Sequence, residues 1–200
     1  GSSQGIGMAT AKQLALLGAN VTLIARNKNK LESVQSSLDT QLGQKHHFIC
    51  VDFSSSDELR THLNDIKSNY HILINNTGGP AGGSITEANT EAFENAFKMH
   101  LVNNQILVQT VIPGMIKEGY GRIVNIISTS VKAPIAGLGV SNTIRAAVAN
   151  WAKTLSLELG EHGITVNNVL PGFTNTNRLK SIISTKSKKQ GISENKVIDT

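Results

Sequence analysis

Short apolar runs alternate with longer amphipathic segments along this chain. The runs typical of β-strands cover residues 21–25, 48–51, 72–74, 123–127 and 164–169. Helical spacing of apolar residues predicts helices over residues 8–17, 29–42, 91–117 and 141–161, and residues 54–57 are rich in capping side chains that begin another helix. This alternation predicts an α/β fold, a doubly wound parallel sheet of Rossmann-like type with helices on both faces.

The two ends of the chain depart from this alternation. A turn of three glycines opens the sequence without a preceding strand, so we expect the first strand of the fold to be missing. The family resemblance set out below implies that the last strand is missing as well. The two strands beside the first one would then lose a ladder partner. Residues 1–200 are expected to form a single domain truncated at both ends, in which residues 175–200 are a lid-like or mobile tail.

Composition excludes several classes of protein. The single cysteine, Cys50, cannot form an internal disulfide or a cysteine metal cluster, and adjacent His46 and His47 have no third ligand in view, so no metal site is expected. No apolar run approaches the ~18 residues of a membrane span, which predicts a cytoplasmic protein without membrane contact. The net charge is +5, but basic residues are scattered and aromatics make up 4%, which disfavours nucleic acid as a partner.

Gly1, Gly5 and Gly7 stand directly before a predicted helix. Glycines at a strand-to-helix turn allow a pyrophosphate to approach the backbone and the helix N-terminus. The spacing here, Gly-x-x-x-Gly-x-Gly, differs from the common Gly-x-Gly-x-x-Gly fingerprint. By themselves the three glycines are equally compatible with a tight structural turn.

Four segments that follow one another along the chain favour the nucleotide-binding interpretation. Residues 1–7, 75–78, 121–128 and 171–176 together resemble the short-chain dehydrogenase/reductase family, in particular its 3-oxoacyl-acyl-carrier-protein reductase-like members, and the similarity extends to about residue 178. The resemblance implies a dinucleotide-binding Rossmann-type domain that transfers hydride between a nicotinamide and a carbonyl or hydroxyl. It also implies a small-molecule or acyl-thioester substrate, and a homo-oligomer, dimer or tetramer, paired through helices 91–117 and 141–161.

The resemblance assigns cofactor roles to three groups of residues. The pyrophosphate would bind at Gly1, Ser2, Ser3, Gly5, Ile6 and Gly7. The adenosine would meet Asp52, Phe53, Asn76, Thr77 and Gly78, and the nicotinamide would meet Pro171, Gly172, Thr174 and Thr176. Ordinary caps and polar turns would also explain many of these residues.

The choice of cofactor follows from the charge of the residue that comes directly after the strand at residues 21–25. Arg26 ends the strand at residues 21–25, where NAD-binding proteins usually carry an acid for the ribose 2′-hydroxyl. An arginine pairs bidentately with phosphate, so the sequence favours NADP over NAD. The alternative is a solvated arginine at a strand end.

The resemblance weakens at the catalytic residues. Ser128 matches the family serine that binds the substrate carbonyl, but Ser141 and Arg145 stand where the family has Tyr and, four residues later, Lys. Residues four apart share one helix face, so the geometry of the pair is kept while a phenol is replaced by a far poorer proton donor. His100 stands where the family has Asn.

Two interpretations of this altered tetrad stay open. In the first, His100 replaces the tyrosine proton path through water or Ser141, and the protein is an NADP-dependent oxidoreductase. In the second, His100 is a packed helix histidine, and the protein is a catalytically silent NADP-binding sensor or partner subunit. Tyr70 and Tyr120 precede strands at the opposite edge of the sheet and are not expected to supply the missing phenol.

Overall fold

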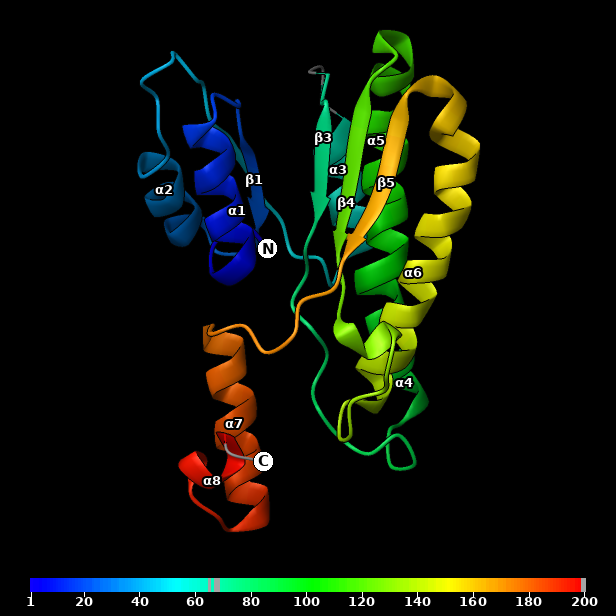
Figure 1. Ribbon diagram of the computed structural model, residues 1–200. Coiled ribbons are helices and arrows are strands. Elements are labelled where there is room, and N and C mark those ends of the chain that lie inside the picture. Colours follow the sequence, from blue (N-terminus) through cyan, green and yellow to red (C-terminus); the bar gives the residue numbers. More distant parts are fainter. Residues whose placement is uncertain (65, 67–68, 199–200) are drawn as a thin grey trace.

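The computed structural model describes residues 1–64, 66 and 69–198, and strands alternate with helices along them (Figure 1). The strands are β1 (Thr22–Ala25), β2 (His47–Cys50), β3 (Ile72–Asn75), β4 (Gly121–Ile126) and β5 (Ile164–Val169). The α-helices are α1 (Gly5–Leu16), α2 (Lys28–Ser36), α3 (Ser56–Asn64), α4 (Thr90–Phe97), α5 (Asn103–Glu118), α6 (Gly139–Leu159), α7 (Asn177–Gln190) and α8 (Glu194–Ile198). Three shorter helices are the π-helix η1 (Lys98–Val102) and the 3-10 helices η2 (Thr129–Val131) and η3 (Gly160–His162).

The strands form two parallel sheets. β1 pairs with β2, and β3, β4 and β5 pair in that order, with every neighbouring pair parallel. The predicted parallel α/β fold is therefore confirmed. The strands nevertheless do not join into one sheet, because none of the described strands lies between β1 and β3 (Figure 1).

A cleft of about 650 Å³ separates the facing edges of β1 and β3. Polar contacts lie near its two ends. At one end the Tyr70 hydroxyl lies 3.2 Å from the Thr22 hydroxyl. At the other end the Ser2 backbone N–H donates to the Ile24 carbonyl at 3.2 Å, and the Ile24 N–H donates to the Ser2 hydroxyl at 2.9 Å. These bonds satisfy part of the β1 edge that would otherwise lack ladder partners.

Alternating side chains on β1 divide the core of the first sheet between its two faces. Leu23 and Ala25 pack with buried residues of α1 and α2. Ile24, which points to the opposite face, packs with Leu59 of α3 and the cluster around it. In Figure 1, α3 and α5 lie behind the strands while α1 lies in front, which confirms helices on both sides.

The second sheet carries the largest helix-covered core. Ile123 of β4 and the inward residues of β5 are covered by apolar residues of α5 and α6. The members of this cluster are Val108, Val111, Met115, Ile123, Ala152, Leu155, Leu159, Ile164 and Val166. Ser128 follows the end of β4 on this sheet, and Ser141 and Arg145 lie in the first two turns of α6.

Two helix predictions differ from the structure. The expected helix 91–117 is divided, because η1 separates α4 from α5 and gives the backbone a π-type turn at His100. The expected helix 29–42 ends at Ser36; beyond it the carbonyl of Asp39 is bonded to the His46 ring at 2.8 Å, which ties this segment to a loop instead. Of the described helices, none combines the length and apolarity that crossing a membrane requires.

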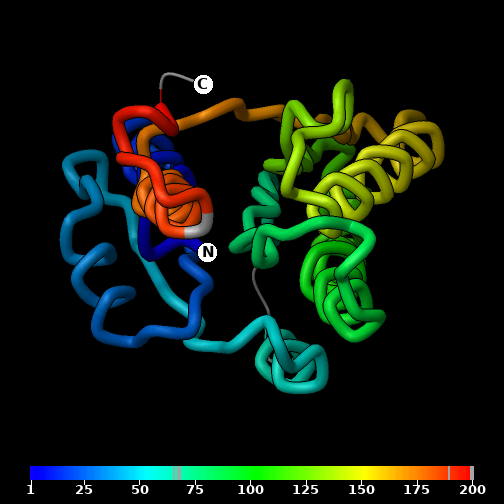
Figure 2. The backbone as a smooth tube through the Cα atoms, turned by 90° about the horizontal axis from the view of Figure 1, so that it is seen from below, coloured from blue at the N-terminus to red at the C-terminus, as the bar shows by residue number. Residues whose placement is uncertain are grey.

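The segment after β5 crosses from one sheet to the other. Figures 1 and 2 both show it leaving the end of β5 and leading to α7, which begins near the start of α1 and in Figure 1 extends away below it. Residues 177–198 are therefore largely helical here, in α7 and α8. The expectation of a lid-like or mobile tail stays a prediction, with α7 as its structured part.

Candidate active site

The glycine turn lies at the carboxyl ends of the parallel strands. A Cβ on Gly7 would overlap the Gly1 carbonyl oxygen and lie 2.6 Å from Nδ2 of Asn76, so this close approach requires glycine. Gly5 begins α1 with a φ of +55°, in the left-handed region that favours glycine. The first turn of α1 contains no acidic residue, which leaves its helix N-terminus open to an anion.

The predicted pyrophosphate, adenosine and nicotinamide segments meet at this turn. The Gly1 amino group donates to the Asn76 carbonyl, and Nδ2 of Asn76 donates to the Gly1 carbonyl at 3.1 Å. A Cβ on Gly5 would touch Cγ2 of Thr176 at 3.5 Å. The fold thus brings together residues that are 75 and 171 positions apart in the sequence.

Arg26 and Asp52 form an ion pair at the ends of β1 and β2. Nη1 of Arg26 lies 3.6 Å from Oδ2 of Asp52, and the arginine side chain is 78% exposed. Asp52 Oδ1 accepts from the Ser54 backbone N–H at 2.9 Å, and this bond, with the nearby Arg26 charge, holds the Asp52 pKa below its ordinary value against the opposing effect of burial. Arg26 is therefore free to turn toward a phosphate, and Asp52 also acts as a turn cap.

Thr174 and Thr176 make local bonds in the crossing segment. The Thr174 hydroxyl donates to the Gly172 carbonyl at 3.4 Å, and the Thr176 hydroxyl caps α7 by accepting from the Leu179 N–H at 3.4 Å. The Pro171 carbonyl accepts from the Thr129 N–H at 3.2 Å, which ties this segment to the turn after β4. Turn chemistry accounts for both threonines here, and their role toward a nicotinamide stays a prediction.

Ser128 lies in the turn that follows β4. Its hydroxyl oxygen accepts from the Ser130 backbone N–H at 3.1 Å and caps η2. A hydroxyl that accepts one bond keeps its own hydrogen for donation. Ser128 is half-buried, so it is placed to donate to a carbonyl oxygen at the carboxyl end of the second sheet.

Arg145 is buried below this turn. Its side chain is 9% exposed, and Nη1 donates to the Ile126 carbonyl at 3.0 Å. Burial, and then the nearby charge of Arg178, lower the Arg145 pKa to about 10. The guanidinium remains a cation at neutral pH. The carbonyl that holds it belongs to Ile126, two residues before Ser128. Ser141 lies one helical turn before Arg145 on α6 and is half-buried.

His100 is almost fully enclosed, with 1% of its surface exposed. Its Nδ1 is hydrogen-bonded to the Thr77 hydroxyl, and its Nε2 has no hydrogen-bond partner among the described residues. Burial and the charge of Arg145 lower the His100 pKa to about 3. The imidazole is therefore neutral near pH 7, which favours the packed interpretation over an imidazolium acid.

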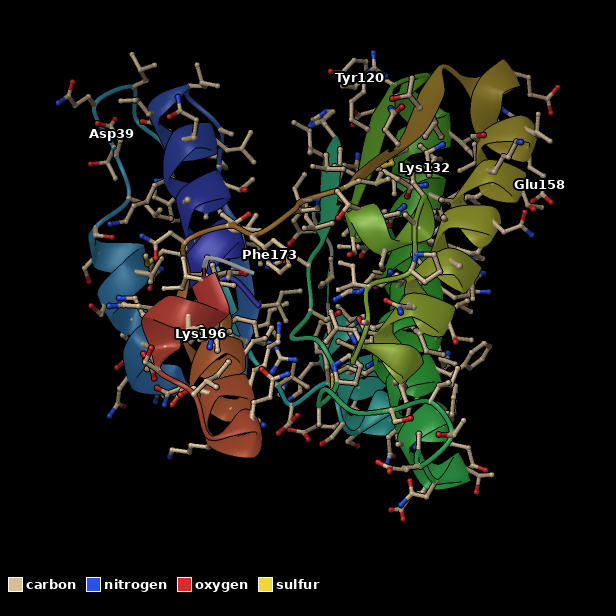
Figure 3. All side chains as sticks on the ribbon, turned by 60° about the horizontal axis from the view of Figure 1, so that its bottom comes forward. Asp39, Tyr120, Lys132, Glu158, Phe173 and Lys196 are labelled. Atoms are coloured by element: carbon tan, nitrogen blue, oxygen red, sulfur yellow. The ribbon has the colours of Figure 1, made fainter. Side chains whose placement is uncertain are left out.

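The two tyrosines lie away from this group, as expected from their positions. Tyr70 contacts Thr22 across the far end of the cleft. Tyr120 precedes β4, where its ring lies under the Arg122 guanidinium at 4.1 Å. Figure 3 shows Tyr120 well separated from Phe173, which lies on the segment that crosses between the sheets. Neither phenol is placed to replace the missing one.

Two features of the site were not foreseen from the sequence. One is a row of asparagines across the second sheet: Asn75 donates to Asn125 at 2.9 Å, and Asn125 donates to Asn168 at 3.0 Å. The strand register places these three side by side, a pairing that strand patterns do not specify. The other is Arg178 of α7, whose Nη2 donates to the Pro80 carbonyl at 2.5 Å.

Parallel strands with a glycine turn, polar carboxyl ends and covering helices define a nucleotide-binding α/β protein. A family model described as short chain dehydrogenase matches residues 1–187. The chain belongs to this family.

Individual relatives agree with this assignment. The NADPH-dependent reductase BacG of Bacillus subtilis is 30% identical over 200 residues, which cover 98% of this chain and 77% of BacG. The putative ketoacyl reductase 1 of the granaticin polyketide synthase of Streptomyces violaceoruber is 32% identical over 181 residues, covering 88% and 66%. L-sorbose reductase from Gluconobacter frateurii, solved with NADPH and L-sorbose, superposes with a TM-score of 0.88 at 27% identity, covering 98% of this chain and 76% of that one.

Proposed function

We propose that this protein is an NADP-dependent oxidoreductase that transfers hydride between a nicotinamide and a carbonyl or hydroxyl compound, with 3-oxoacyl thioesters among its candidate substrates. One observation carries the proposal: the close glycine turn before α1 opens at the same strand ends as Ser128 and the buried Arg145 cation. The names of the NADPH-dependent and ketoacyl reductase relatives support the choice of cofactor and substrate class.

The residues of the chain fit such a cofactor. The glycine turn, in which Gly7 allows close packing against Gly1 and Asn76, and the α1 N-terminus without an acidic residue suit a pyrophosphate. Arg26, exposed and lacking a neighbouring acid other than Asp52 among the described ion pairs, suits a ribose 2′-phosphate. Thr77 and Gly78 come shortly after the carboxyl end of β3, and a Cβ on Gly78 would meet no atom within 4 Å. When bound, NADPH would supply the hydride.

The side chains of the site would stabilise the oxygen of the substrate. Reduction of a carbonyl places negative charge on its oxygen, which needs hydrogen-bond donors and a nearby cation. The Ser128 hydroxyl retains a hydrogen for donation, and Arg145 supplies positive charge in a desolvated setting where its effect is strong. The carbonyl carbon gains hydride and the oxygen gains a proton, which yields the alcohol and NADP⁺.

The source of that proton is the point at which this chain departs from the family pattern of Tyr and Lys. Ser141 has an aliphatic hydroxyl and is a poor acid by itself. The neutral His100 ring could pass protons between its two nitrogens, from the Thr77 side to the unpartnered Nε2 side, without becoming a cation. We therefore keep a water-linked path through His100 and Ser141 as the proton route of this proposal.

A second function is favoured by the same two substitutions. If Ser141 and Arg145 provide no proton route, the chain would bind NADP without turnover and serve as a sensor or partner subunit. The two functions differ in one measurable property, since both require NADP binding and only the first requires oxidation of NADPH by a carbonyl compound.

The test uses the whole chain. NADPH and NADH are titrated separately by cofactor fluorescence, and absorbance is then followed at saturating NADPH with a panel of 3-oxoacyl thioesters, ketones and aldehydes. Preferred binding of NADPH with steady turnover is the expected result. Binding without turnover across the panel would favour the silent function, and no binding of either nucleotide would overturn both.

A further inference from the structure

Two arginine side chains from distant parts of the chain converge on one glycine. A Cβ added at Gly79 would lie 3.8 Å from Nη2 of Arg145 and 3.7 Å from Nη2 of Arg178. Arg145 belongs to α6 and Arg178 to the first turn of α7. Two guanidinium groups therefore lie around the same small space above the Gly79–Pro80 backbone.

Neither arginine has an acidic partner in the described part of the chain. The ion pairs found there involve other basic residues, and Arg145 and Arg178 bond only to the carbonyls of Ile126 and Pro80. Burial, and then the charge of Arg178, lower the Arg145 pKa, so the second guanidinium adds to the cost of the first. A buried cation without a counter-charge is costly to the fold unless something else compensates it.

The position of Arg178 adds to the positive potential. It is the second residue of α7, whose first turn contains no acid and whose N-terminus carries partial positive charge. A cation is unfavourable in this place, whereas an anion there is stabilised by the helix and by both guanidinium groups. The Arg178–Pro80 bond of 2.5 Å fixes the second guanidinium beside the first.

We propose that Arg145 and Arg178 together bind a carboxylate carried by the substrate, so that the carbonyl compound reduced at Ser128 is an oxo acid. This inference rests on the proposed function for the identity of the reaction, but the binding of the anion does not depend on turnover. Paired guanidinium groups match the two oxygens of a carboxylate. Gly79 leaves the space between them open, since a larger residue would place its side chain there.

A phosphate of the cofactor is the other anion that could fill this site. The glycine turn and the open N-terminus of α1 already offer a place for the pyrophosphate. Arg145 of the pair donates instead to the Ile126 carbonyl at the end of β4, two residues before Ser128, where the proposed reaction takes place. This separation favours the substrate as the source of the anion.

The test compares two probes that differ in charge only. Acetoacetate and its neutral methyl ester are titrated by calorimetry into the whole chain at low ionic strength, with saturating NADP⁺ so that no hydride is transferred, and again without nucleotide. We expect acetoacetate to bind at least about tenfold more tightly than the ester, since hydrogen bonds to charged groups contribute strongly. Arg178→Gln should reduce this preference to about twofold or less.

Matched variants separate the site from general charge and from folding. Lys180→Gln removes the same charge from the same helix at an exposed position and should keep the preference. Gly79→Ala keeps both charges but fills the space between them, and it should also weaken the binding of acetoacetate. Thermal unfolding of each variant checks that the chain remains folded.

The outcomes distinguish this proposal from the proposed function. Equal binding of the two probes, or no binding of acetoacetate, would overturn the carboxylate site. Loss of NADP⁺ affinity in Arg178→Gln with the probe preference unchanged would assign the anion to the cofactor and also overturn it. A retained preference for acetoacetate in a chain that binds no NADP⁺ would support the site and refute the proposed function.

Discussion

At the scale of the residue, Arg26 has the role most open to direct measurement. Its guanidinium is largely exposed and only loosely paired with Asp52 at 3.6 Å. Arg26→Ala should weaken NADPH binding about tenfold, the effect of losing charged hydrogen bonds to a phosphate, and should leave NADH binding nearly unchanged. Fluorescence titration of both nucleotides measures this.

Lys28→Ala is the matched control, because Lys28 is a neighbouring exposed cation paired with Glu32 at 3.9 Å. It should alter neither affinity by more than about twofold, as expected for an exposed ion pair. Equal weakening of NADPH and NADH by Arg26→Ala would show that this residue does not recognise the 2′-phosphate.

Because His100 is buried and neutral, we expect the free energy of unfolding to depend on pH. Its folded-state pKa is about 3 and its ordinary value is 6.5, so between these pH values the unfolded chain binds a proton that the folded chain does not. The stability that this neutral histidine contributes is present above pH 6.5 and is lost as the pH falls toward 3, by at most about 1.4 kcal/mol per pH unit.

Urea unfolding from pH 7 to 4 measures this contribution in the chain and in His100→Asn. The variant should show a shallower loss of stability with falling pH, whatever its absolute stability. Exposed His47→Asn serves as the control and should follow the unchanged chain. Parallel pH profiles for His100→Asn and the unchanged chain would contradict the buried, neutral state of His100.

At the scale of the element, α6 presents the substituted pair on one face. Ser141 and Arg145 are one turn apart, so Ser141→Tyr combined with Arg145→Lys places a phenol and an ammonium in the positions that the resemblance gives them. Supplying a positioned general acid should raise carbonyl reduction about 100-fold. Steady-state oxidation of NADPH measures the change.

Arg145→Lys by itself is the control for the charge at this position and should not raise turnover. A double variant that binds NADPH as before yet turns over no faster would show that the proton route of this chain does not pass through position 141. The π-turn of η1 belongs to the same scale, because it sets the His100 ring against Thr77.

At the scale of the whole molecule, exposed apolar side chains support the predicted pairing through the two long helical segments. Leu157 on α6 is 80% exposed and Phe97 at the end of α4 is 45% exposed. We propose that a second copy of the chain covers them, since burial of such side chains favours association. Leu157→Glu should convert the oligomer to a monomer in light scattering.

Leu42→Glu tests the specificity of that effect, because Leu42 is 74% exposed but lies in the loop before β2. It should leave the oligomer intact. A chain that is monomeric before any substitution would contradict the predicted assembly.

The pattern of apolar residues sufficed for the strands and for the parallel architecture. Each strand prediction agrees with a described strand within two residues at either end, because burial on both faces leaves a continuous apolar run. Helix ends were less certain: the end of α2 depends on the bond between His46 and Asp39, and the division at η1 depends on packing around His100. Neither is encoded in the local period.

The candidate site divides in the same way. The glycine turn and Arg26 follow from local spacing and side-chain chemistry, and the resemblance to the family singled out Ser128 and the 141–145 pair, so the sequence by itself determined all of them as candidates. The tertiary structure decided the enclosure of His100, the asparagine row and the meeting of Arg145 with Arg178 over Gly79. These depend on contacts between segments distant along the chain, whose geometry arises only when strands take their register and helices pack against them.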